Sequence, residues 1–342
     1  MASSGTVTYR ATANTIINGA LRLLGAIDAE NNNSPSTNQT SGGLEALNML
    51  VKTWQTNGLQ LWERKYAVIF PRVGQAVYVL GSPGPAGDHA CLSTPLNAGY
   101  VQTTLSAAAA SGATTISVTS VTGQLSTTGN TAVTITTAYN IGVQLDSGDL
   151  QWTTVNGAPS GTTVTLTAVL TGAAAAGNYV FCYQTKLFRP LRILDAFMRV
   201  ITGGNDIPVR ILSRDEYNRF GMKSSQGTAV QLYYDPQVNT GHLYWYPVPS
   251  NVTQNLFIEF QKPIEDFATS ADDFDMPQEW ADALKFNLAR RLAPEYEVSQ
   301  YKYNQIKDLA DETYKAINNW DQEAASVYLQ PSNWDYNMDG RK

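Results

Sequence analysis

The densest group of acidic side chains in the sequence is Asp272-Asp-Phe-Asp275, followed by Glu279. Paired carboxyl groups can serve as general acid and base in the hydrolysis of a glycosidic bond. Acidic residues also gather at helix N-termini, because the helix macrodipole favours negative charge there. No histidine, lysine or second motif converges on this cluster in the sequence. We therefore interpret Asp272, Asp273, Asp275 and Glu279 as a structural cluster at a helix N-terminus, with catalysis as the weaker alternative.

A second candidate site is Asp335-Tyr-Asn337-Met-Asp339-Gly340, near the C-terminus. Oxygen-bearing side chains at alternate positions, followed by glycine, are typical of the opening of a calcium-binding loop. Such a loop also needs a bidentate glutamate at its twelfth position, and only two residues follow Gly340. We expect an acidic tail or a docking peptide here, with no metal and no cofactor.

The sequence contains only two cysteines, Cys91 and Cys182, and two histidines, His89 and His242. Two cysteines cannot supply a disulfide framework or a four-ligand zinc site. The pair could be close enough to form one disulfide, but in a reducing cytosol we expect free, buried thiols. The sequence contains no phosphate-binding glycine loop followed by lysine, no nucleophile elbow and no C-x-x-C motif. These features favour a structural or assembly role over an enzyme.

Charge and length set further limits. The 342 residues are enough for two or three domains, and 43% of them are hydrophobic. The net charge of −6 argues against a protein that grips phosphate over a broad face, because such proteins carry clustered basic residues. No apolar run approaches the roughly 20 residues of a membrane span, and Met1–Thr6 does not have the character of a secretion signal. We expect assembly in the cytosol.

One region differs sharply in composition from the rest. Residues 73 to 185 contain no lysine or arginine and only three acidic residues. Two octets in this region, Thr114–Val121 and Thr162–Val169, match class for class and alternate with period two, as strands do. We predict an inserted all-β, sandwich-like domain over residues 82–184, the alternative being a long linker rich in threonine and glycine.

The flanking sequence predicts helices. Helical periodicity covers residues 12–26 and 44–57, and further helices are expected over 277–294 and 298–325. Two short apolar segments, 65–70 and 75–80, predict a hairpin. The expected fold is α+β: a helical core with a small antiparallel β region (residues 1–81 and 185–297), the insert, a long C-terminal helix (298–326) and an extended tail (327–342).

Several of these flanking segments resemble one family, the head-to-tail adaptors of short-tailed bacteriophages, also called tail accessory factors or packaged-DNA-stabilisation proteins. The resemblance covers about 230 residues outside the insert, and it rests on the order and spacing of the segments rather than on any single one. The segments are Ala13-Asn-Thr-Ile-Ile-Asn-Gly-Ala-Leu-Arg-Leu-Leu-Gly25, Ala46-Leu-Asn-Met-Leu-Val-Lys-Thr-Trp54, Pro208-Val-Arg-Ile-Leu-Ser-Arg-Asp-Glu-Tyr217, Tyr233-Tyr-Asp-Pro236 with Gly241-His-Leu-Tyr-Trp-Tyr-Pro-Val-Pro249, and Phe267–Trp280 with Ala283–Pro294.

The resemblance implies a ring, usually of twelve copies, that attaches beneath the portal protein after DNA packaging. Such a ring extends the DNA channel, helps to retain the genome and carries the tail nozzle and the tail fibres or spikes. It acts in the virion and involves no enzymatic activity and no membrane. Twelve chains of net charge −6 would give roughly −72 per ring, which would let double-stranded DNA slide past without sequence-specific binding.

Aromatic and aliphatic residues near the C-terminus are candidates for docking on the portal, because buried aromatic anchors dominate many interfaces. The candidates are Ile306, Ile317, Trp320, Tyr328, Trp334 and Tyr336. The insert is expected on the outer side of the ring, where it would contact fibres. Two other functions stay open: a glycan-binding or adhesive virion protein that acts through the β-domain, and a cell-wall glycosidase that uses the acidic cluster.

Overall fold

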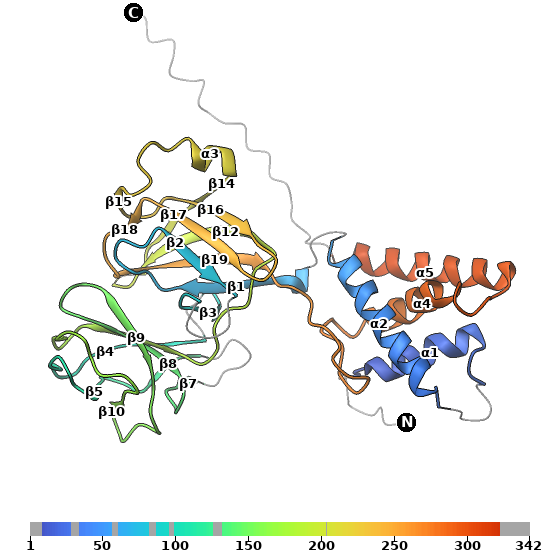
Figure 1. The fold of residues 1–342 in the computed structure, drawn as a ribbon, viewed down its shortest axis with the longest axis horizontal. Helices are drawn as coiled ribbons and strands as arrows, with labels where there is room; N and C mark the ends of the chain where they lie inside the picture. Colours follow the sequence, from blue (N-terminus) through green and yellow to red (C-terminus); the bar gives the residue numbers. More distant parts are fainter. Residues whose placement is uncertain are drawn as a thin grey trace, which may run out of the picture. The chain divides into compact units, whose positions relative to one another are not determined.

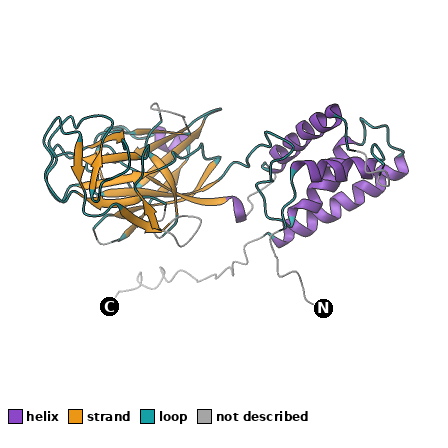
Figure 2. Cartoon of the chain, turned by 90° about the horizontal axis from the view of Figure 1, so that it is seen from below, coloured by secondary structure: helices purple, strands orange, loops and turns teal. Residues whose placement is uncertain are grey.

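The computed structural model describes residues 9–28, 34–56, 61–81, 87–95, 99–125, 132–202 and 204–321. The chain divides into two compact units, one formed by residues 1–61 and 266–342 and the other by residues 62–265. The helices of Figure 1 gather in the first unit, apart from the short α3 (Arg214–Asn218), while the strands belong to the second (Figure 2). The predicted tail, with Tyr328, Trp334 and Tyr336, lies outside the described residues.

Within the described residues, the first unit contains four helices. They are α1 (Ala13–Leu24), α2 (Thr37–Trp54), α4 (Trp280–Leu292) and α5 (Gln300–Trp320). Helix α4 contacts each of the other three, so its apolar side chains form the centre of the bundle. Three rings from three helices, Trp54, Trp280 and Tyr314, lie with centroids 5.0–6.2 Å apart. The two ends of the sequence therefore share one core.

Local signals explain where these helices begin and end. Thr12 caps α1, and Gly25 ends it in the left-handed conformation that favours glycine. Helix α2 begins at Thr37, earlier than the predicted residue 44, because Ser36 and Gln39 form a capping box. The expected start of α4 at Pro277 is also wrong: residues 277–279 form turns and the helix begins at Trp280.

The second unit is a stack of sheets whose middle layer has five antiparallel strands. In spatial order these are β13 (Asp206–Pro208), β12 (Arg192–Val200), β19 (Gln254–Gln261), β1 (Arg64–Ile69) and β3 (Ala90–Ser93), with the short 3-10 helix η1 (Leu61–Glu63) leading into β1. Alternate residues of one strand serve two cores: Ala67 and Ile69 join one hydrophobic cluster, and Val68 joins another. This explains why β19 is buried on both faces.

The first of those clusters lies against a second sheet. Its strands are β14 (Arg210–Leu212), β16 (Gln231–Pro236), β17 (Gly241–Tyr246) and β2 (Val77–Leu80), and the pair β15 (Gln226–Gly227) and β18 (Val248–Pro249) lies nearby. The predicted hairpin of residues 65–70 and 75–80 is wrong. Strand β1 pairs with β19 and β3, whereas β2 pairs with β17, so the intervening turn carries the chain from one sheet to the next.

The second cluster lies against a third sheet of four strands. They are β4 (Val101–Thr104), β11 (Tyr179–Tyr183), β8 (Asn140–Gln144) and β9 (Leu150–Thr154), and the pairs β5 (Thr115–Ser117) with β10 (Thr163–Thr165) and β6 (Thr122–Leu125) with β7 (Ala132–Thr134) complete this part of the chain. The two octets of the sequence pair with each other, Ile116 opposite Val164. Bridges from Leu105 to Val118 and from Val155 to Leu166 link β5 and β10 to the sheet.

These strands form two copies of one three-stranded unit. Copy one is β4, β5 and β8, and copy two is β9, β10 and β11. Several links in one copy have a partner in the other: Thr119 N donates to Thr104 O over 2.8 Å, and Thr167 N donates to Thr154 O over 2.9 Å. The hydroxyl pairs Thr104–Thr119 (3.0 Å) and Thr154–Thr167 (2.9 Å) also correspond. The octet repeat is thus part of a longer structural repeat.

The expectation of a helical core with a small antiparallel β region is wrong. Among the described residues 32% lie in strands and 25% in helices, although the broad α+β label remains compatible. The error lies in the extent of the β region after residue 185. Strands β12, β13, β14, β16, β17 and β19 form two of the three main sheets, together with β1, β2 and β3. Residue 90, inside the predicted insert, belongs to β3 of the middle sheet.

Candidate functional site

A pocket of about 370 Å³ opens beside the turn between β8 and β9, within the second unit. Its polar and aromatic lining comes from four stretches of sequence: the turn after β1, the segment before β3, β9 with its preceding turn, and the segment after β10. The principal residues are Arg72, Asp88, His89, Asp149, Trp152 and Thr171. The volume falls within the roughly 300–1,000 Å³ of small-molecule sites.

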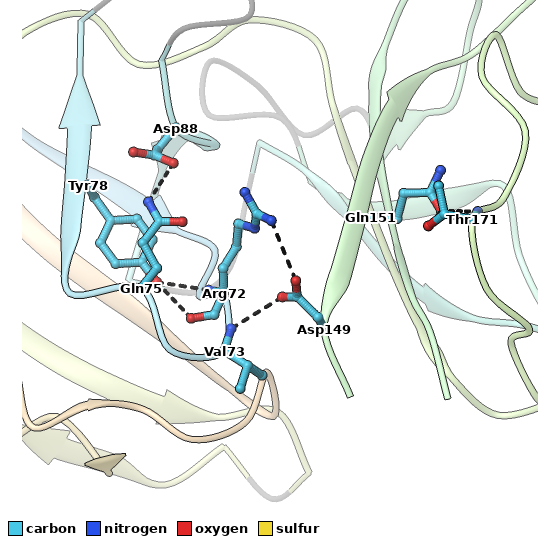
Figure 3. A network of polar contacts seen from close by, with 8 residues as sticks. All are labelled: Arg72, Val73, Gln75, Tyr78, Asp88, Asp149, Gln151 and Thr171. Carbon is cyan, nitrogen blue, oxygen red and sulfur yellow. Dashed lines mark hydrogen bonds and ion pairs between the residues drawn. The ribbon is translucent and has the colours of Figure 1, made fainter. Parts of the chain in front are cut away.

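A salt bridge joins two walls of the pocket. Arg72 Nη2 lies 3.5 Å from Asp149 Oδ2, and the backbone N–H of Val73 donates to Asp149 Oδ1 over 3.2 Å (Figure 3). The hydroxyl of Tyr78 accepts a hydrogen bond from Arg72 N at 2.8 Å and fixes the turn that carries this arginine. Burial raises the pKa of Tyr78 above its ordinary value, so the phenol stays neutral. Both charged groups of the salt bridge keep partial contact with solvent.

Asp88 is held in place by backbone and amide donors. Its two carboxylate oxygens accept hydrogen bonds from Gln75 Nε2 and Val79 N, both over 2.7 Å (Figure 3 draws the first). Lys186 Nζ donates a hydrogen bond over 2.5 Å to the carbonyl oxygen of Gly87, the residue before Asp88. Asp88 therefore anchors the segment that enters β3, and each oxygen retains capacity for a further donor.

An aromatic pair forms another part of the lining. The rings of His89 and Trp152 are parallel, with centroids 3.9 Å apart, and His89 Nδ1 lies 2.7 Å from the hydroxyl of Tyr183. Gly142 packs against Trp152, so close that a Cβ added to this glycine would be 2.8 Å from the indole ring. Burial lowers the pKa of His89 to about 3, and the positive charges of Lys186 and Arg72 add to the effect. His89 is thus neutral near pH 7.

Gln151 and Thr171 form a polar pair along the same pocket. Gln151 Oε1 accepts hydrogen bonds from the backbone N–H of Thr171 over 2.6 Å and from its hydroxyl over 2.9 Å (Figure 3). Gln151 Nε2 donates to the carbonyl oxygen of Val169 over 2.8 Å. These bonds hold the segment after β10 against β9.

The chemistry of the pocket suits binding better than catalysis. A histidine with a pKa near 3 is a poor proton donor or acceptor near neutral pH, because general acid–base catalysis works best when the pKa lies near the working pH. Within the described ranges, no three histidine, cysteine, aspartate or glutamate side chains gather as a metal site would require. The pocket offers hydrogen-bond donors and acceptors beside neutral rings.

The acidic cluster has a structural arrangement. Asp272 accepts hydrogen bonds from Thr269 N, Ala268 N and the hydroxyl of Thr269, over 2.7, 2.8 and 2.7 Å. These bonds lower the pKa of Asp272, first through the backbone N–H of Thr269. Asp273 lies 3.7 Å from Arg10. These hydrogen bonds and the contact with Arg10 hold the turn in place within the helical unit.

Two other acidic residues complete the predicted cluster. Glu279 is the N-cap residue of α4, but its side chain makes no capping hydrogen bond, and Asp275 lies just before the helix in the sequence. The structure therefore has one carboxylate that closes a turn and others that lie near a helix start. Of the four acids, Glu279 lines a pocket of about 220 Å³, where its acidic neighbour is Asp282 rather than another member of the cluster.

The docking candidates on α5 differ in exposure. Ile306 is buried, and Ile317 is half-buried, both within the four-helix unit. Trp320 is 64% exposed. The docking candidates on α5 therefore lie partly in the core of the bundle and partly on its surface.

Both cysteines are free and buried, Cys91 in β3 and Cys182 in β11. Burial raises the pKa of both thiols, which keeps them protonated and unreactive near neutral pH. The expectation of free, buried thiols agrees with this arrangement.

Sequence reasoning missed the pocket, although its residues carried a signal. Asp88 and Asp149 are two of the three acidic residues in the stretch from 73 to 185, and Trp152 is the only tryptophan there. Charged and indole side chains in a region otherwise rich in threonine, glycine and alanine are candidates for a site. What the sequence did not show is that Arg72, at the edge of that stretch, meets Asp149.

No protein-family model matches this chain, and no curated protein matches it significantly. None of the helices within the described ranges has the length and apolarity that crossing a bilayer requires.

Proposed function

We propose that this chain is a structural protein of a bacteriophage virion, an adaptor ring that joins the portal to the tail. The resemblance on which this depends includes residues 13–25, 46–54 and 283–294, which contain all of α1, the second half of α2 and most of α4 in one unit. The ring would extend the DNA channel, help to retain the genome and carry the nozzle and fibres or spikes. The β unit, which is larger than we expected from the sequence, would supply surface to those tail proteins.

The observation that carries the proposal is the outer side of α5. Tyr301, Leu309 and Trp320 are 75%, 42% and 64% exposed, and at 3.6 residues per turn their spacing places them within about 100° of one another around the helix. The adjoining face packs into the bundle through Ile306 and Ala310. A helix with exposed apolar residues beside its buried face suits a protein that has both a core and a partner.

The acidic cluster gives the competing glycosidase function no support. The Asp272 carboxylate is engaged with the backbone of its own turn, and a carboxylate with a lowered pKa is a poor general acid. An assembly role needs no such group.

The proposal predicts a closed ring when the full chain is mixed with the portal protein of a short-tailed phage. Electron microscopy and particle mass would detect it. The double variant Tyr301→Ser/Trp320→Ser should weaken attachment or ring closure at least tenfold, because large exposed aromatics are the usual anchors of interfaces. Lys307→Ser, at another exposed position of α5, is the matched control and should assemble as the natural chain does.

A chain that stays monomeric and does not bind portal would overturn the proposal. Assembly that the double variant leaves unchanged would retain the ring but exclude the outer side of α5 as its contact.

A further inference from the structure

The two copies of the three-stranded unit differ at the pocket. In copy one, Val101 and Gly123 occupy the positions that correspond to Gln151 and Thr171 in copy two. Gly123 lies directly on Val101, so close that an added Cβ would be 2.6 Å from the Val101 Cα. In copy two the corresponding residues are a hydrogen-bonded polar pair. Since the same backbone forms with an apolar contact in copy one, the fold alone does not require the polar pair.

The rest of the pocket wall differs in the same direction. Counting along the corresponding strands, Trp152 matches Gln102 and Asp149 matches Gly99. Copy two therefore has a carboxylate and an indole where copy one has a glycine and an amide. The polar and aromatic residues of the pocket are concentrated in one of two otherwise equivalent places.

The donors and acceptors of the pocket lie in pairs. The guanidinium of Arg72 meets only Asp149 among the described residues, so most of its five N–H donors remain available. Its neighbour Asp149 supplies acceptors 3.5 Å away. A donor and an acceptor side by side suit adjacent hydroxyl groups, each of which can donate to the carboxylate and accept from the guanidinium. The Asp88 carboxylate and the Thr171 hydroxyl oxygen, whose proton is donated to Gln151, add further acceptors.

The remaining lining suits the carbon skeleton of such a ligand. His89 is neutral near pH 7 and stacks on Trp152, so the two rings form one apolar surface. Both faces of the indole are covered, one by His89 and the other by Gly142, which leaves the outer side of the imidazole as the available aromatic surface. Polar rims beside an apolar surface are typical of small-molecule pockets.

Two other ligand classes fit less well. A phosphate or sulfate would meet Asp88 and Asp149 as well as Arg72, and like charges repel at that range. A divalent cation prefers several carboxylate oxygens that are not already engaged, whereas Asp88 and Asp149 both accept backbone N–H groups and Asp149 pairs with a cation. A neutral ligand rich in hydroxyl groups avoids both penalties.

We propose that the pocket lined by Arg72, Asp88, His89, Asp149 and Gln151 binds a saccharide unit through adjacent hydroxyl groups. This goes beyond the adaptor function and does not depend on it. The Arg72–Asp149 pair recognises the hydroxyl groups, and the His89 ring contacts the C–H face of the sugar.

The test is a titration of the full chain, followed by NMR of its backbone amides. The probes are methyl glycosides of neutral hexoses and of N-acetylhexosamines, with sodium phosphate and calcium chloride as comparison ligands. At least one glycoside should shift the amide signals of Val73 and Gly148, with a dissociation constant in the millimolar range that suits a ligand of this size. A purified bacterial polysaccharide that contains the binding sugar should compete for the same signals if the natural source is a cell surface, and should not compete if it is a free sugar.

Asp149→Asn keeps the size of the side chain and removes its charge, and should weaken glycoside binding at least about tenfold. Asp146→Asn is the matched control: it lies in the same turn, but its Oδ1 accepts hydrogen bonds from Ala175 N and Asn178 Nδ2, and it does not line the pocket. It should bind as the natural chain does. If Asp149→Asn does not fold, Arg72→Met provides the same comparison from a half-exposed position.

Three results would overturn the proposal. In the first, no glycoside shifts signals near the pocket. In the second, phosphate or calcium binds there and the sugars do not. In the third, a folded Asp149→Asn or Arg72→Met chain binds the glycoside as tightly as the natural chain.

Discussion

The two copies of the three-stranded unit share a backbone and differ in their side chains. In both copies a threonine hydroxyl of the first strand meets a threonine hydroxyl beyond the second, and the corresponding backbone bonds agree to about 0.1 Å. At one pair of corresponding positions, however, the copies differ. Copy one has Val101 packed against Gly123, and copy two has Gln151 hydrogen-bonded to Thr171. The comparison separates residues that the fold requires from residues that are free to serve a ligand.

The hydrophobic residues of the copies belong to the first class. Ile116 and Val164 face each other at the centre of the repeat, and Val118 and Leu166 occupy corresponding bridge positions. All four are buried in one cluster. Apolar residues at period two are sufficient to place both copies, because one face of each strand must be removed from water.

The largest predicted effect comes from giving copy one a residue of copy two. Gly123→Thr places a Cβ 2.6 Å from the Cα of Val101, and since the obstacle is backbone, no side-chain rotation relieves it. We expect a loss of about 3 kcal/mol in the free energy of unfolding, as for severe overpacking. Urea unfolding of the full chain, followed by tryptophan fluorescence, measures it.

The reciprocal change is the control. Thr171→Gly removes a hydroxyl hydrogen bond and adds backbone freedom, and should cost only about 1–2 kcal/mol. Adding Val101→Gln to Gly123→Thr should not restore stability, because the Cα of residue 101 stays where it is. Equal costs for Gly123→Thr and Thr171→Gly would show that the two positions are not packed differently.

The sequence predicted the repeat better than it predicted the fold around it. The octets at 114–121 and 162–169 gave the correct period and two real strands, because period-two burial is a local property of a strand. The same local reasoning failed at residues 65–80. Both segments there are strands, but which sheet each joins is decided by partners such as Phe257 and Tyr244, far away in the sequence.

The helices and the pocket show the same limit. Helix α1 was predictable from its apolar positions and Gly25, whereas the start of α2 was decided by a pair of side chains, Ser36 and Gln39, that we did not recognise. Individual pocket residues stood out in the composition. Their proximity in the fold could not be predicted, because a salt bridge between residues 72 and 149 depends on how the sheets stack.

A smaller effect follows from His89, which packs on Trp152 of copy two and has no counterpart on Gln102 of copy one. Its pKa is about 3 in the folded chain and 6.5 ordinarily, so below pH 6.5 the unfolded chain binds a proton that the folded chain does not. The contribution of His89 to the free energy of unfolding is fully present above pH 6.5 and declines as the pH falls towards 3. We expect the free energy of unfolding to be about 2 kcal/mol lower at pH 5 than at pH 7.

Urea unfolding at both pH values checks the prediction. His89→Phe keeps a ring on Trp152 and should remove most of the difference between pH 5 and pH 7, whatever its effect at pH 7. His242→Asn, in β17 and away from the pocket, should retain the difference. If His89→Phe keeps the full acid sensitivity, the proton is bound elsewhere.

The smallest effect tests whether the copies are equivalent in energy as well as in geometry. Thr104→Val and Thr154→Val each remove one hydroxyl from corresponding pairs, at 3.0 and 2.9 Å, on strands that are half-buried in the same way. Each should cost about 0.5–1 kcal/mol, the net value of a partly exposed hydrogen bond. Strands β4 and β9 are the outer strands of their sheet, separated by two others at about 4.8 Å spacing, so the double variant should show additive costs.

Urea unfolding of the two single variants and the double variant gives all three values. A cost at Thr154 that exceeds the cost at Thr104 by 1 kcal/mol or more would mean that the Gln151–Thr171 pair and the pocket beside it depend on this hydroxyl, and that copy two has diverged in its supporting hydrogen bonds as well as in its lining.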